Sequence, residues 1–394
     1  MSYPTVKILP GEDRRLRNGS PWLFSNELRM DAEAKALPPG TLVRLMAPSG
    51  KMLGIAQFNP HSLIAGRMLT RNKDAQIDRG FLTRRITRAL QLRDRLFETP
   101  HYRLIHAEAD GLPGLVVDRS GDTLVVQFNS AGMDMLAGPV TEALDEVVRP
   151  RTIIARNDAP ARQLEGLASE VKALKGAIGD RLELVENGLR FVIDPSGGQK
   201  TGWFYDQRVN RAFAADLCRG EAVLDLYSYC GGFALTAAAR GASSVTAVDS
   251  SAAALELAAA SAELQGQAAV CSFERAEVFA FLDHAAQDKR KFGVVIADPP
   301  AFVRSKKDLG SGLKGYRKVA RMAAALVTEP GFLCLGCCSH HVTPEQFAAE
   351  TWAGIREAGR GGRLLRSAGA GPDHPTHPAL PESAYLKFLA YALD

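Results

Sequence analysis

The 394-residue sequence predicts an α/β protein in which a small β-barrel and an α+β central domain precede a Rossmann-like seven-stranded sheet. From about residue 195 onward, strand-like and helix-like segments alternate, which is typical of a parallel sheet with crossover helices. Residues 1–72 instead contain short strand patterns separated by Pro-Gly, Pro-Pro-Gly and Pro-Ser-Gly turns. We therefore expect three domains, at residues 1–72, 73–194 and 195–394.

The composition excludes several classes of protein. Hydrophobic residues make up 46% and charged residues 23%, ordinary values that exclude general disorder. No apolar run approaches the roughly 20 residues that span a bilayer. The N-terminal residues lack the charged-then-apolar pattern of a secretory leader, and six cysteines are too few for a disulfide scaffold. We expect a cytoplasmic protein that does not bind membranes.

The net charge of +4 is unevenly distributed. Residues 1–100 contain 17 basic and 9 acidic residues, a net charge of +8, whereas the remaining 294 residues carry −4. This asymmetry indicates either a module that binds a polyanion or a chance clustering of solvated charges. Charge alone supports the two interpretations equally.

Secondary-structure signals are clear in the first two expected domains. Four strands are expected in the barrel, at Thr5–Leu9, Thr41–Met46, Met52–Phe58 and Leu63–Leu69. Residues 77–97 show an apolar stripe at helical spacing, and the arginines of this segment, Arg93 among them, fall mostly off it and are expected to be solvated. The central domain is expected to have a helix near 133–148 and strands at Leu115–Asp118, Thr123–Phe128, Thr152–Ala155 and within 182–194.

The last domain alternates between the two patterns. Its expected helices include Phe233–Arg240 and Ala252–Leu264. Its seven expected strands are Ala222–Tyr227, Ser244–Val248, Val270–Phe273, Gly293–Ala297, Gly331–Gly336, Arg363–Ser367 and Tyr385–Ala392.

A glycine-containing loop, Asp-Leu-Tyr-Ser-Tyr-Cys-Gly-Gly-Phe (225–233), follows the first of these strands. Ligands of open α/β sheets bind beyond the carboxyl ends of the strands, where glycine lets the backbone approach them closely. Tyr227 and Tyr229 occupy early positions where a nicotinamide-binding loop would have glycine, which disfavours an oxidoreductase. A paired glycine is also often only a tight turn.

Acidic residues follow the next two strands. Asp249 could accept hydrogen bonds from both ribose hydroxyls of an adenosine ligand, although it or Ser250 could instead cap the following helix. Glu277, after the third strand, could receive the adenine amino group. With the glycine loop, these acids favour an adenosine-containing ligand.

The fourth strand ends in Asp298-Pro-Pro. Consecutive prolines cannot continue a strand ladder, so they form a stiff loop that would hold the acid toward a substrate. An Asp-Pro-Pro sequence at this place is typical of S-adenosylmethionine enzymes that methylate planar nitrogenous groups.

Cysteines crowd the end of the fifth strand, where Cys337 and Cys338 would lie beside Asp298 in a doubly wound sheet. A thiolate is a strong nucleophile toward an electron-poor ring carbon. The alternatives are buried structural thiols, or a metal site with His340 and His341. The spacing is wrong for a zinc site, and we expect no metal.

Five motifs occur in order along nearly the whole chain. They are His-Ala-Glu-Ala-Asp-Gly-Leu-Pro-Gly-Leu (106–115), Gln-Lys-Thr-Gly-Trp-Phe-Tyr-Asp-Gln-Arg (199–208), Tyr-Ser-Tyr-Cys-Gly-Gly-Phe (227–233), Asp-Pro-Pro-Ala-Phe (298–302) and Asp-His-Pro (373–375). Together they resemble the bacterial 23S ribosomal RNA cytosine-5 methyltransferases that carry an N-terminal PUA domain. The resemblance implies a PUA RNA-binding barrel, an α+β central domain and a class I S-adenosylmethionine-dependent methyltransferase domain.

The resemblance also implies roles for individual residues. Cys338 would be the catalytic nucleophile that adds to C6 of cytosine, and Asp298 would hydrogen-bond the N3 and N4 edge of the base. A second cysteine, Cys337, precedes the nucleophile here, which leaves it as the alternative thiol. The cofactor S-adenosyl-L-methionine would be bound by Gln207, Asp225, Tyr227, Gly231, Gly232, Phe233, Asp249, Glu277 and Asp298. Separately, the basic character of the N-terminal region leads us to expect that RNA is bound by Arg14, Arg15, Arg17, Arg67 and Arg71, together with Lys200.

The expected partner is 23S ribosomal RNA or a ribosomal particle, and a homodimer is an expectation that rests on the resemblance alone. Two other functions stay open on the sequence. One is a methyltransferase that acts on an exocyclic base amine through the Asp-Pro-Pro loop, without a cysteine nucleophile. The other is a non-catalytic RNA-binding or ribosome-assembly protein.

Overall fold

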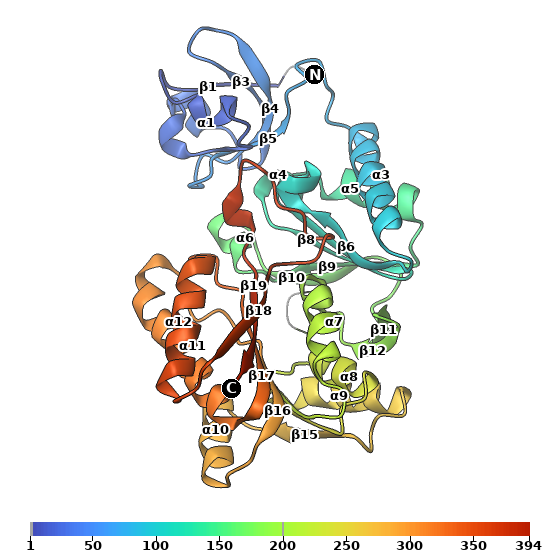
Figure 1. The fold of residues 1–394 in the computed structure, drawn as a ribbon. Coiled ribbons are helices and arrows are strands. Elements are labelled where there is room, and N and C mark those ends of the chain that lie inside the picture. Colours follow the sequence, from blue (N-terminus) through green and yellow to red (C-terminus); the bar gives the residue numbers. More distant parts are fainter. Residues whose placement is uncertain (1–2, 199–200) are drawn as a thin grey trace. The chain divides into compact units, whose positions relative to one another are not determined.

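The structure is a computed structural model that describes residues 3–198 and 201–394 (Figure 1). Its contacts divide the chain into two compact units. The first unit comprises Met1–Asp180, Pro195–Trp203 and Pro372–Pro381, and the second comprises Arg181–Asp194, Phe204–Gly371 and Glu382–Asp394. The division into three domains at residues 72 and 194 stays a prediction.

The first unit begins with a five-stranded sheet in the order β1-β3-β4-β5-β2, which surrounds its own apolar core. The strands are β1 (Thr5–Lys7), β2 (Trp22–Leu23), β3 (Thr41–Met46), β4 (Met52–Phe58) and β5 (Gly66–Thr70), with the short helices α1 (Arg14–Arg17) and α2 (Ala32–Lys35). Alternation fixes which side chains enter the core, since Val43 and Leu45 of β3 are both fully buried. The two-residue strand β2 is too short to give a period-2 signal, and the sequence did not predict it.

A second five-stranded sheet of this unit has the order β10-β9-β8-β7-β6. Its strands are β6 (His101–His106), β7 (Leu115–Ser120), β8 (Thr123–Phe128), β9 (Thr152–Asn157) and β10 (Glu170–Lys175). Helices α3 (Arg79–Leu96), α4 (Ala131–Met135), α5 (Ala137–Val148) and α6 (Ala161–Leu164) accompany it, and α3 packs against α5 over a shared core. The single helix expected near 133–148 is therefore two helices, of which α4 is capped by the Ser130 hydroxyl.

The second unit contains the expected seven-stranded, doubly wound sheet, in the order β15-β14-β13-β16-β17-β19-β18. Its strands are β13 (Ala222–Leu226), β14 (Ser244–Asp249), β15 (Cys271–Arg275), β16 (Phe292–Ala297), β17 (Val327–Cys337), β18 (Gly362–Ala368) and β19 (Lys387–Leu393). The first five strands pair in parallel, and β19 is antiparallel to both β17 and β18. A separate hairpin, β11 (Leu182–Glu186) and β12 (Leu189–Ile193), belongs to this unit.

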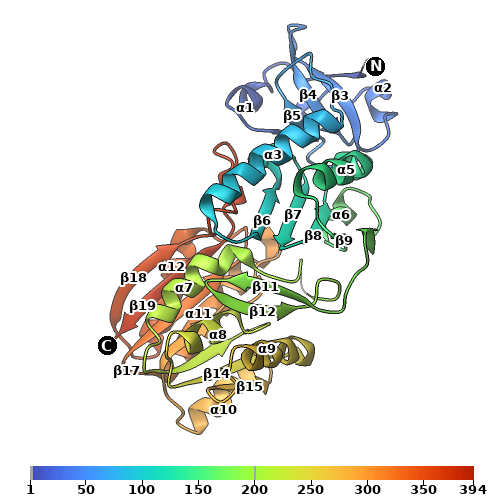
Figure 2. The same cartoon turned by 90° about the vertical axis from the view of Figure 1, so that its right-hand side faces the viewer.

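Helices cover both faces of this sheet (Figure 2). One face carries α7 (Arg208–Asp216), α8 (Gly232–Ala239) and α9 (Ala252–Leu264), and the other carries α10 (Val278–Gln287), α11 (Leu309–Leu326) and α12 (Pro344–Glu357). Each face has its own apolar core. Helix α11 was not predicted, because Gly310, Gly312 and Gly315 lower the helix propensity of its first turns.

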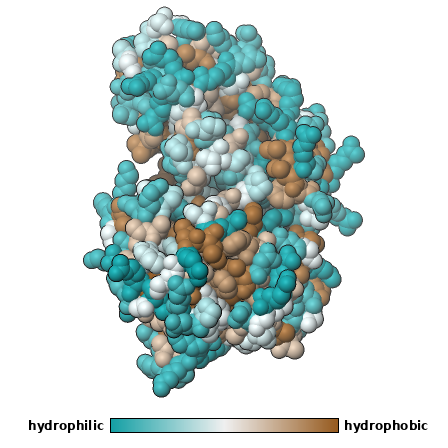
Figure 3. Space-filling model, viewed as in Figure 1, coloured by the Kyte–Doolittle hydropathy of each residue, from teal (hydrophilic) through white to brown (hydrophobic). Residues whose placement is uncertain are grey.

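The molecular face drawn in Figure 3 is largely hydrophilic, with local groups of apolar residues. On the edge strand β18, Leu364 and Leu365 are 49% and 46% exposed. No helix within residues 3–198 and 201–394 combines the length and the apolar character that crossing a membrane requires.

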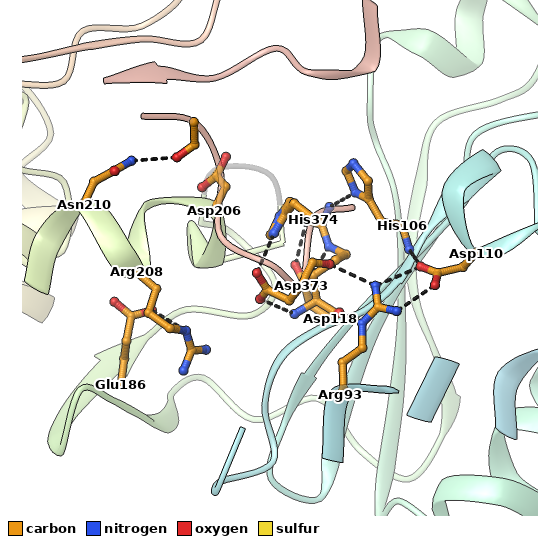
Figure 4. A network of polar contacts seen from close by, with 12 residues as sticks. Arg93, His106, Asp110, Asp118, Glu186, Asp206, Arg208, Asn210, Asp373 and His374 are labelled. Carbon is orange, nitrogen blue, oxygen red and sulfur yellow. Dashed lines mark hydrogen bonds and ion pairs between the residues drawn. The ribbon is translucent and has the colours of Figure 1, made fainter. Parts of the chain in front are cut away.

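Two of the sequence motifs, His-Ala-Glu-Ala-Asp and Asp-His-Pro, meet in a buried polar network of the first unit (Figure 4). Arg93 of α3 is fully buried, so its expected solvation was wrong. Its guanidinium donates to both carboxylate oxygens of Asp110, at 2.6 and 2.8 Å, and to the carbonyls of Arg103 and Asp373. The Asp373 carboxylate accepts the Arg103 amide and faces Nδ1 of His374, both at 3.0 Å. These contacts hold the segment around Asp373 within the first unit.

We expect Arg93→Met to destabilise the protein by about 3–5 kcal/mol, because it leaves the buried Asp110 carboxylate without its cation. Equilibrium unfolding in urea measures the loss. Arg151→Met is the control, since Arg151 and Asp122 form an exposed pair whose removal should leave the unfolding curve unchanged. An unchanged curve for Arg93→Met would contradict a stabilising role for the network.

Candidate active site

The loop between β13 and α8 has an unusual backbone conformation. Tyr227, Tyr229 and Gly231 have positive φ angles of 61°, 50° and 77°. The two tyrosines therefore adopt the left-handed conformation that a glycine-rich loop would use, at a cost of about 1–3 kcal/mol each. The loop turns sharply although it lacks the early glycines, and its strain is maintained by the surrounding contacts.

The paired glycines that follow are required by crowding. A Cβ atom on Gly231 would lie 3.0 Å from Cβ of Ala258, and one on Gly232 would lie 2.6 Å from Nε of Arg211. Arg211 is itself fixed by a buried ion pair of 2.6 Å with Glu186. A larger residue at either position would collide with Ala258 or with Arg211.

Asp225 lies at the end of β13 and is 1% exposed. Its Oδ2 accepts the amide of Ala234 at 2.9 Å, whereas its Oδ1 is buried and meets no hydrogen-bond partner among the described residues. Burial raises the pKa of this carboxyl to about 8, and the nearby Asp298 raises it further against the opposing Ala234 amide and Arg211. The site therefore contains a buried acceptor that a cationic or N–H group could satisfy.

Asp249 ends the neighbouring strand β14 and organises the loop. Its two oxygens accept the amides of Tyr229 and Ser251, each at 2.9 Å. The cap of α9 is Ser251, so Asp249 is not needed as the helix cap. Each carboxylate oxygen has a second lone pair that remains available to ribose hydroxyls.

Glu277 lies directly before α10 and is exposed. It is close to Tyr227, since burial and then the charge of Glu277 raise the pKa of the Tyr227 hydroxyl. The Glu277 carboxylate therefore lies just after β15, the third strand along the chain, and its contact with adenine stays a prediction.

Asp298 follows β16 and is oriented by Gln207, whose Nε2 donates to its Oδ2 at 2.9 Å. Gln207 is 2% exposed, and its Oε1 accepts the side-chain amide of Asn210 at 2.7 Å. A Cβ atom on Gly336 of β17 would overlap Oδ1 of Asp298, so only glycine leaves room for this carboxylate. The sheet thus brings Asp298 against the strand that leads to the cysteines.

The two adjacent cysteines have different environments. Cys337, the last residue of β17, is fully buried in the core beside Tyr316. Cys338 is half-buried, and its Sγ lies 3.9 Å from the carbonyl oxygen of Pro299 in the Asp298 loop. The alternation of side chains at the end of a strand therefore leaves Cys338 as the thiol beside Asp298.

Ser339 ties this cysteine segment to its neighbours. Its hydroxyl lies 2.7 Å from that of Tyr316 and accepts the amide of Val303 at 3.2 Å. The Asp298 loop and Cys338 therefore share one fully buried anchor. Tyr316 lies on α11, and neither the helix nor this contact was predicted from the sequence.

Comparison with known proteins identifies the family. Residues 165–387 match the family described as S-adenosylmethionine-dependent methyltransferase, and residues 6–71 match the PUA-like domain. Ribosomal RNA large subunit methyltransferase I of Pseudoalteromonas atlantica is 35% identical over 389 residues, 98% of each chain. The protein of the same name from Salmonella arizonae is 33% identical over 99% of this chain and 97% of its own. The chain belongs to this family of S-adenosylmethionine-dependent methyltransferases.

Solved structures show the same methyltransferase fold. A Streptococcus mutans protein described as a SAM-dependent methyltransferase aligns with a TM-score of 0.83 over 99% of this chain and 100% of its own, at 20% identity. Another methyltransferase structure, in complex with SAH, aligns with the same score and identity over the whole of both chains. At this identity the likeness concerns the fold.

The methyltransferase site fits its cofactor, which carries adenosine, ammonium and carboxylate groups. Besides Oδ1 of Asp225, the buried hydroxyl of Ser228 in the loop has no hydrogen-bond partner among the described residues. These polar atoms, with Asp249 and Glu277, would hold the cofactor's polar groups. Phe233 differs, because its ring stacks on Phe388 in the core, and a cofactor contact would involve its backbone. The individual binding roles stay predictions.

Three of the arginines predicted to bind RNA lie on α1. Arg14 and Arg15 line a shallow hollow of about 520 Å³ on the first unit. Arg17 is 66% exposed and pairs with Asp13. Arg15 is 47% exposed and pairs with Glu27 at 3.3 Å, so the charges of Arg15 and Arg17 lie at the surface but each has an acidic partner. Contact of the three arginines with RNA stays a prediction.

The other predicted RNA-binding residues are placed differently. The Arg67 guanidinium is only 15% exposed and pairs with Glu108 and Glu165, each at 3.1 Å, so its charge is already compensated. Arg71 donates to the carbonyl of Leu16 at 2.5 Å. Lys200 lies outside the described residues. The RNA-binding roles of these residues also stay predictions.

We expect the cofactor-free methyltransferase to lose stability as pH rises from about 4 toward 8, because of Asp225. The carboxyl ionises near 3.8 in the unfolded chain but only near 8 in the folded one. As pH rises, the carboxyl therefore loses its proton in the unfolded chain before it does so in the folded one. The stabilisation is fully present below about pH 4 and is lost once pH exceeds the pKa of about 8 in the folded protein. Urea unfolding at a series of pH values measures this for the wild type and for Asp225→Asn.

The difference in unfolding free energy between wild type and Asp225→Asn should change across this range. Asp216→Asn is the matched control, because Asp216 is 62% exposed and should show no such change. Parallel pH profiles for the wild type and Asp225→Asn would exclude the raised pKa.

Proposed function

We propose that this methyltransferase forms 5-methylcytosine in 23S ribosomal RNA through a covalent bond between Sγ of Cys338 and C6 of the target cytosine. The names of the relatives support ribosomal RNA of the large subunit as the substrate. The observation that carries the chemistry is the half-buried thiol of Cys338 beside the Asp298-Pro-Pro loop. The burial of Cys337 in the core supports Cys338 over Cys337 as the nucleophile.

C5 of cytosine is too weak a nucleophile to accept a methyl group unaided, and the chain's residues would activate it. When bound, S-adenosylmethionine supplies an electrophilic methyl group. The Cys338 thiolate donates an electron pair to C6, the C5–C6 π pair moves to C5, and C5 becomes nucleophilic. Asp298, oriented by Gln207, would hydrogen-bond the N3 and N4 edge, where charge accumulates. After methylation a base removes the C5 proton, the C5–C6 double bond returns, and Sγ departs with the pair of the Sγ–C6 bond.

The target base must also leave its stack to reach this edge of the sheet, at a cost of a few kcal/mol. Phosphate contacts on the first unit would offset that cost. Besides the arginines of α1, helix α3 presents Arg84, Arg88 and Arg95 on one exposed face, and none of the three forms an ion pair within the described residues. Both groups of arginines can contribute to a sequence-independent RNA contact.

We expect Cys338→Ala to abolish the covalent adduct with RNA that contains 5-fluorocytosine, because fluorine blocks the removal of the C5 substituent and traps the bond to Sγ. Denaturing gel electrophoresis after incubation with cofactor detects the adduct. Cys337→Ala is the matched control and should retain it, since this thiol lies in the core.

An adduct that persists in Cys338→Ala and disappears in Cys337→Ala would reverse the assignment of the nucleophile. Methyl transfer that persists when both cysteines are replaced would favour an exocyclic amine as the acceptor, with Asp298 as the main polar contact.

We expect the triple change Arg14→Gln, Arg15→Gln and Arg17→Gln to weaken RNA binding and to flatten its salt dependence. Each lost phosphate contact lowers the slope of log K against log salt by about 0.7–0.9. Fluorescence anisotropy with a large-subunit RNA fragment at several salt concentrations measures the slope. A charge-matched control replaces Arg190, Arg240 and Arg363, which are paired and exposed on the second unit. Equal slopes for the two triple variants would remove α1 from the RNA-binding surface.

We propose a cytoplasmic location for the enzyme, supported by its six free cysteines, which suit a reducing compartment. The homodimer stays a prediction.

A further inference from the structure

Lys387 is a buried lysine at the end of the sheet where the cysteines lie. It is the first residue of β19 and lies opposite Cys337 in the register of β17 and β19. The residue is only 5% exposed. Its ammonium donates to the carbonyl oxygens of Ser339 at 2.6 Å and Tyr385 at 2.7 Å. Ser339 directly follows Cys338, and Tyr385 lies two residues before Lys387, so the ammonium links the cysteine segment to the start of β19.

This ammonium has no carboxylate partner among the described residues. A buried cation is costly unless an anion or several dipoles compensate it. Burial lowers the pKa of Lys387, and the thiols of Cys337 and Cys338 oppose that change, Cys337 also through a hydrogen bond. The two thiols are therefore the ionisable groups that could supply the missing negative charge.

Other titratable groups around this point do not replace the thiols. Burial raises the pKa of Tyr316 on α11, which keeps its hydroxyl neutral. The Tyr385 hydroxyl donates to Asp206, and the exposed His340 packs its ring against that of Tyr385. Asp298 lies against Gly336 and would oppose a second negative charge near Cys338. A cation near Cys338 would favour the thiolate form of this residue against the opposing charge of Asp298.

We propose that Lys387 is a positioning residue that stabilises the thiolate of Cys338 and fixes the backbone of the Cys338–Ser339 segment. The inference rests on the proposed nucleophilic role of Cys338. In the resting enzyme the thiol proton passes to solvent, and Lys387 retains its own. The same ammonium would stabilise the thiolate again when the Sγ–C6 bond breaks and Sγ departs with its electron pair.

The pH dependence of alkylation of Cys338 tests this without catalysis. The full-length protein is treated with iodoacetamide at pH 5–10, and modification of Cys338 is followed by peptide mass spectrometry. In Lys387→Gln, whose amide can still donate to the two carbonyls, we expect the midpoint to rise by about one pH unit or more and the rate near neutral pH to fall about tenfold. Lys387→Arg retains the charge and should restore much of the rate.

The matched control is Lys291→Gln. Lys291 is an exposed lysine of the same unit that also donates to a carbonyl, that of Ala325 at 2.7 Å, away from the thiols. Its loss should leave the alkylation profile of Cys338 unchanged. A profile for Lys387→Gln that coincides with the wild type, in folded protein, would overturn the proposal.

A measurement on the wild type alone decides the matter if the variants fail to fold. Cys271 is a half-buried thiol whose pKa burial raises to about 11. Alkylation of Cys338 should have a midpoint well below that of Cys271, and an equal or higher midpoint would exclude thiolate stabilisation. The fluorocytosine adduct separates the two hypotheses: an adduct on Cys338 with an unaltered profile in Lys387→Gln removes only the role of Lys387. An altered profile without any adduct removes only the proposed reaction.

Discussion

The parallel pairing of β14, β13, β16 and β17 is the constraint on which the site depends. Because these strands run in the same direction, their carboxyl ends share one edge of the sheet, and Asp249, Asp225, Asp298 and Cys338 all lie at that edge. Gly336 of β17 has no side chain, and a Cβ atom there would overlap Oδ1 of Asp298, so the glycine lets Asp298 lie directly against the strand that ends at the cysteines. A bulkier residue there would separate the acid from the thiol.

The same geometry concentrates negative charge, and the structure compensates it in two ways. Burial raises the pKa of Asp225 to about 8, so this acid is neutral in the cofactor-free protein below that pH. At Asp298 the Gln207 amide donates a hydrogen bond to the carboxylate and is itself held by Asn210. A site arranged in this way can accept a cationic cofactor without a large change in its fold, since the acceptors are already in place.

Much of this edge could be predicted from the sequence because it depends on local order. A strand ending in an acid, followed by glycine or proline, marks the position of a ligand loop whatever the rest of the chain does, and Asp225, Asp249 and Asp298 were found in this way. The environments of charged side chains could not be predicted from local sequence order, because their partners are distant in sequence. Arg93 lies off the apolar stripe of α3 yet is buried by Asp110 and the carbonyl of Asp373, 280 residues away. Likewise, the basic count of the N-terminal part includes Arg67, whose charge two glutamates already neutralise.

Distinguishing the two adjacent cysteines requires both the sequence and the three-dimensional structure. Position at the strand end does not by itself separate Cys337 from Cys338, and at the sequence level only the resemblance favoured Cys338. Strand alternation separates them, placing one in the core with Tyr316 and the other near the carbonyl of Pro299. The charge partner that we propose for Cys338 is Lys387, which lies opposite Cys337 on a strand that enters the sheet antiparallel, some fifty residues later in the chain. An antiparallel neighbour presents its first residue at the same edge where a parallel strand ends, so the reversed direction of β19 is what brings a cation to the thiols.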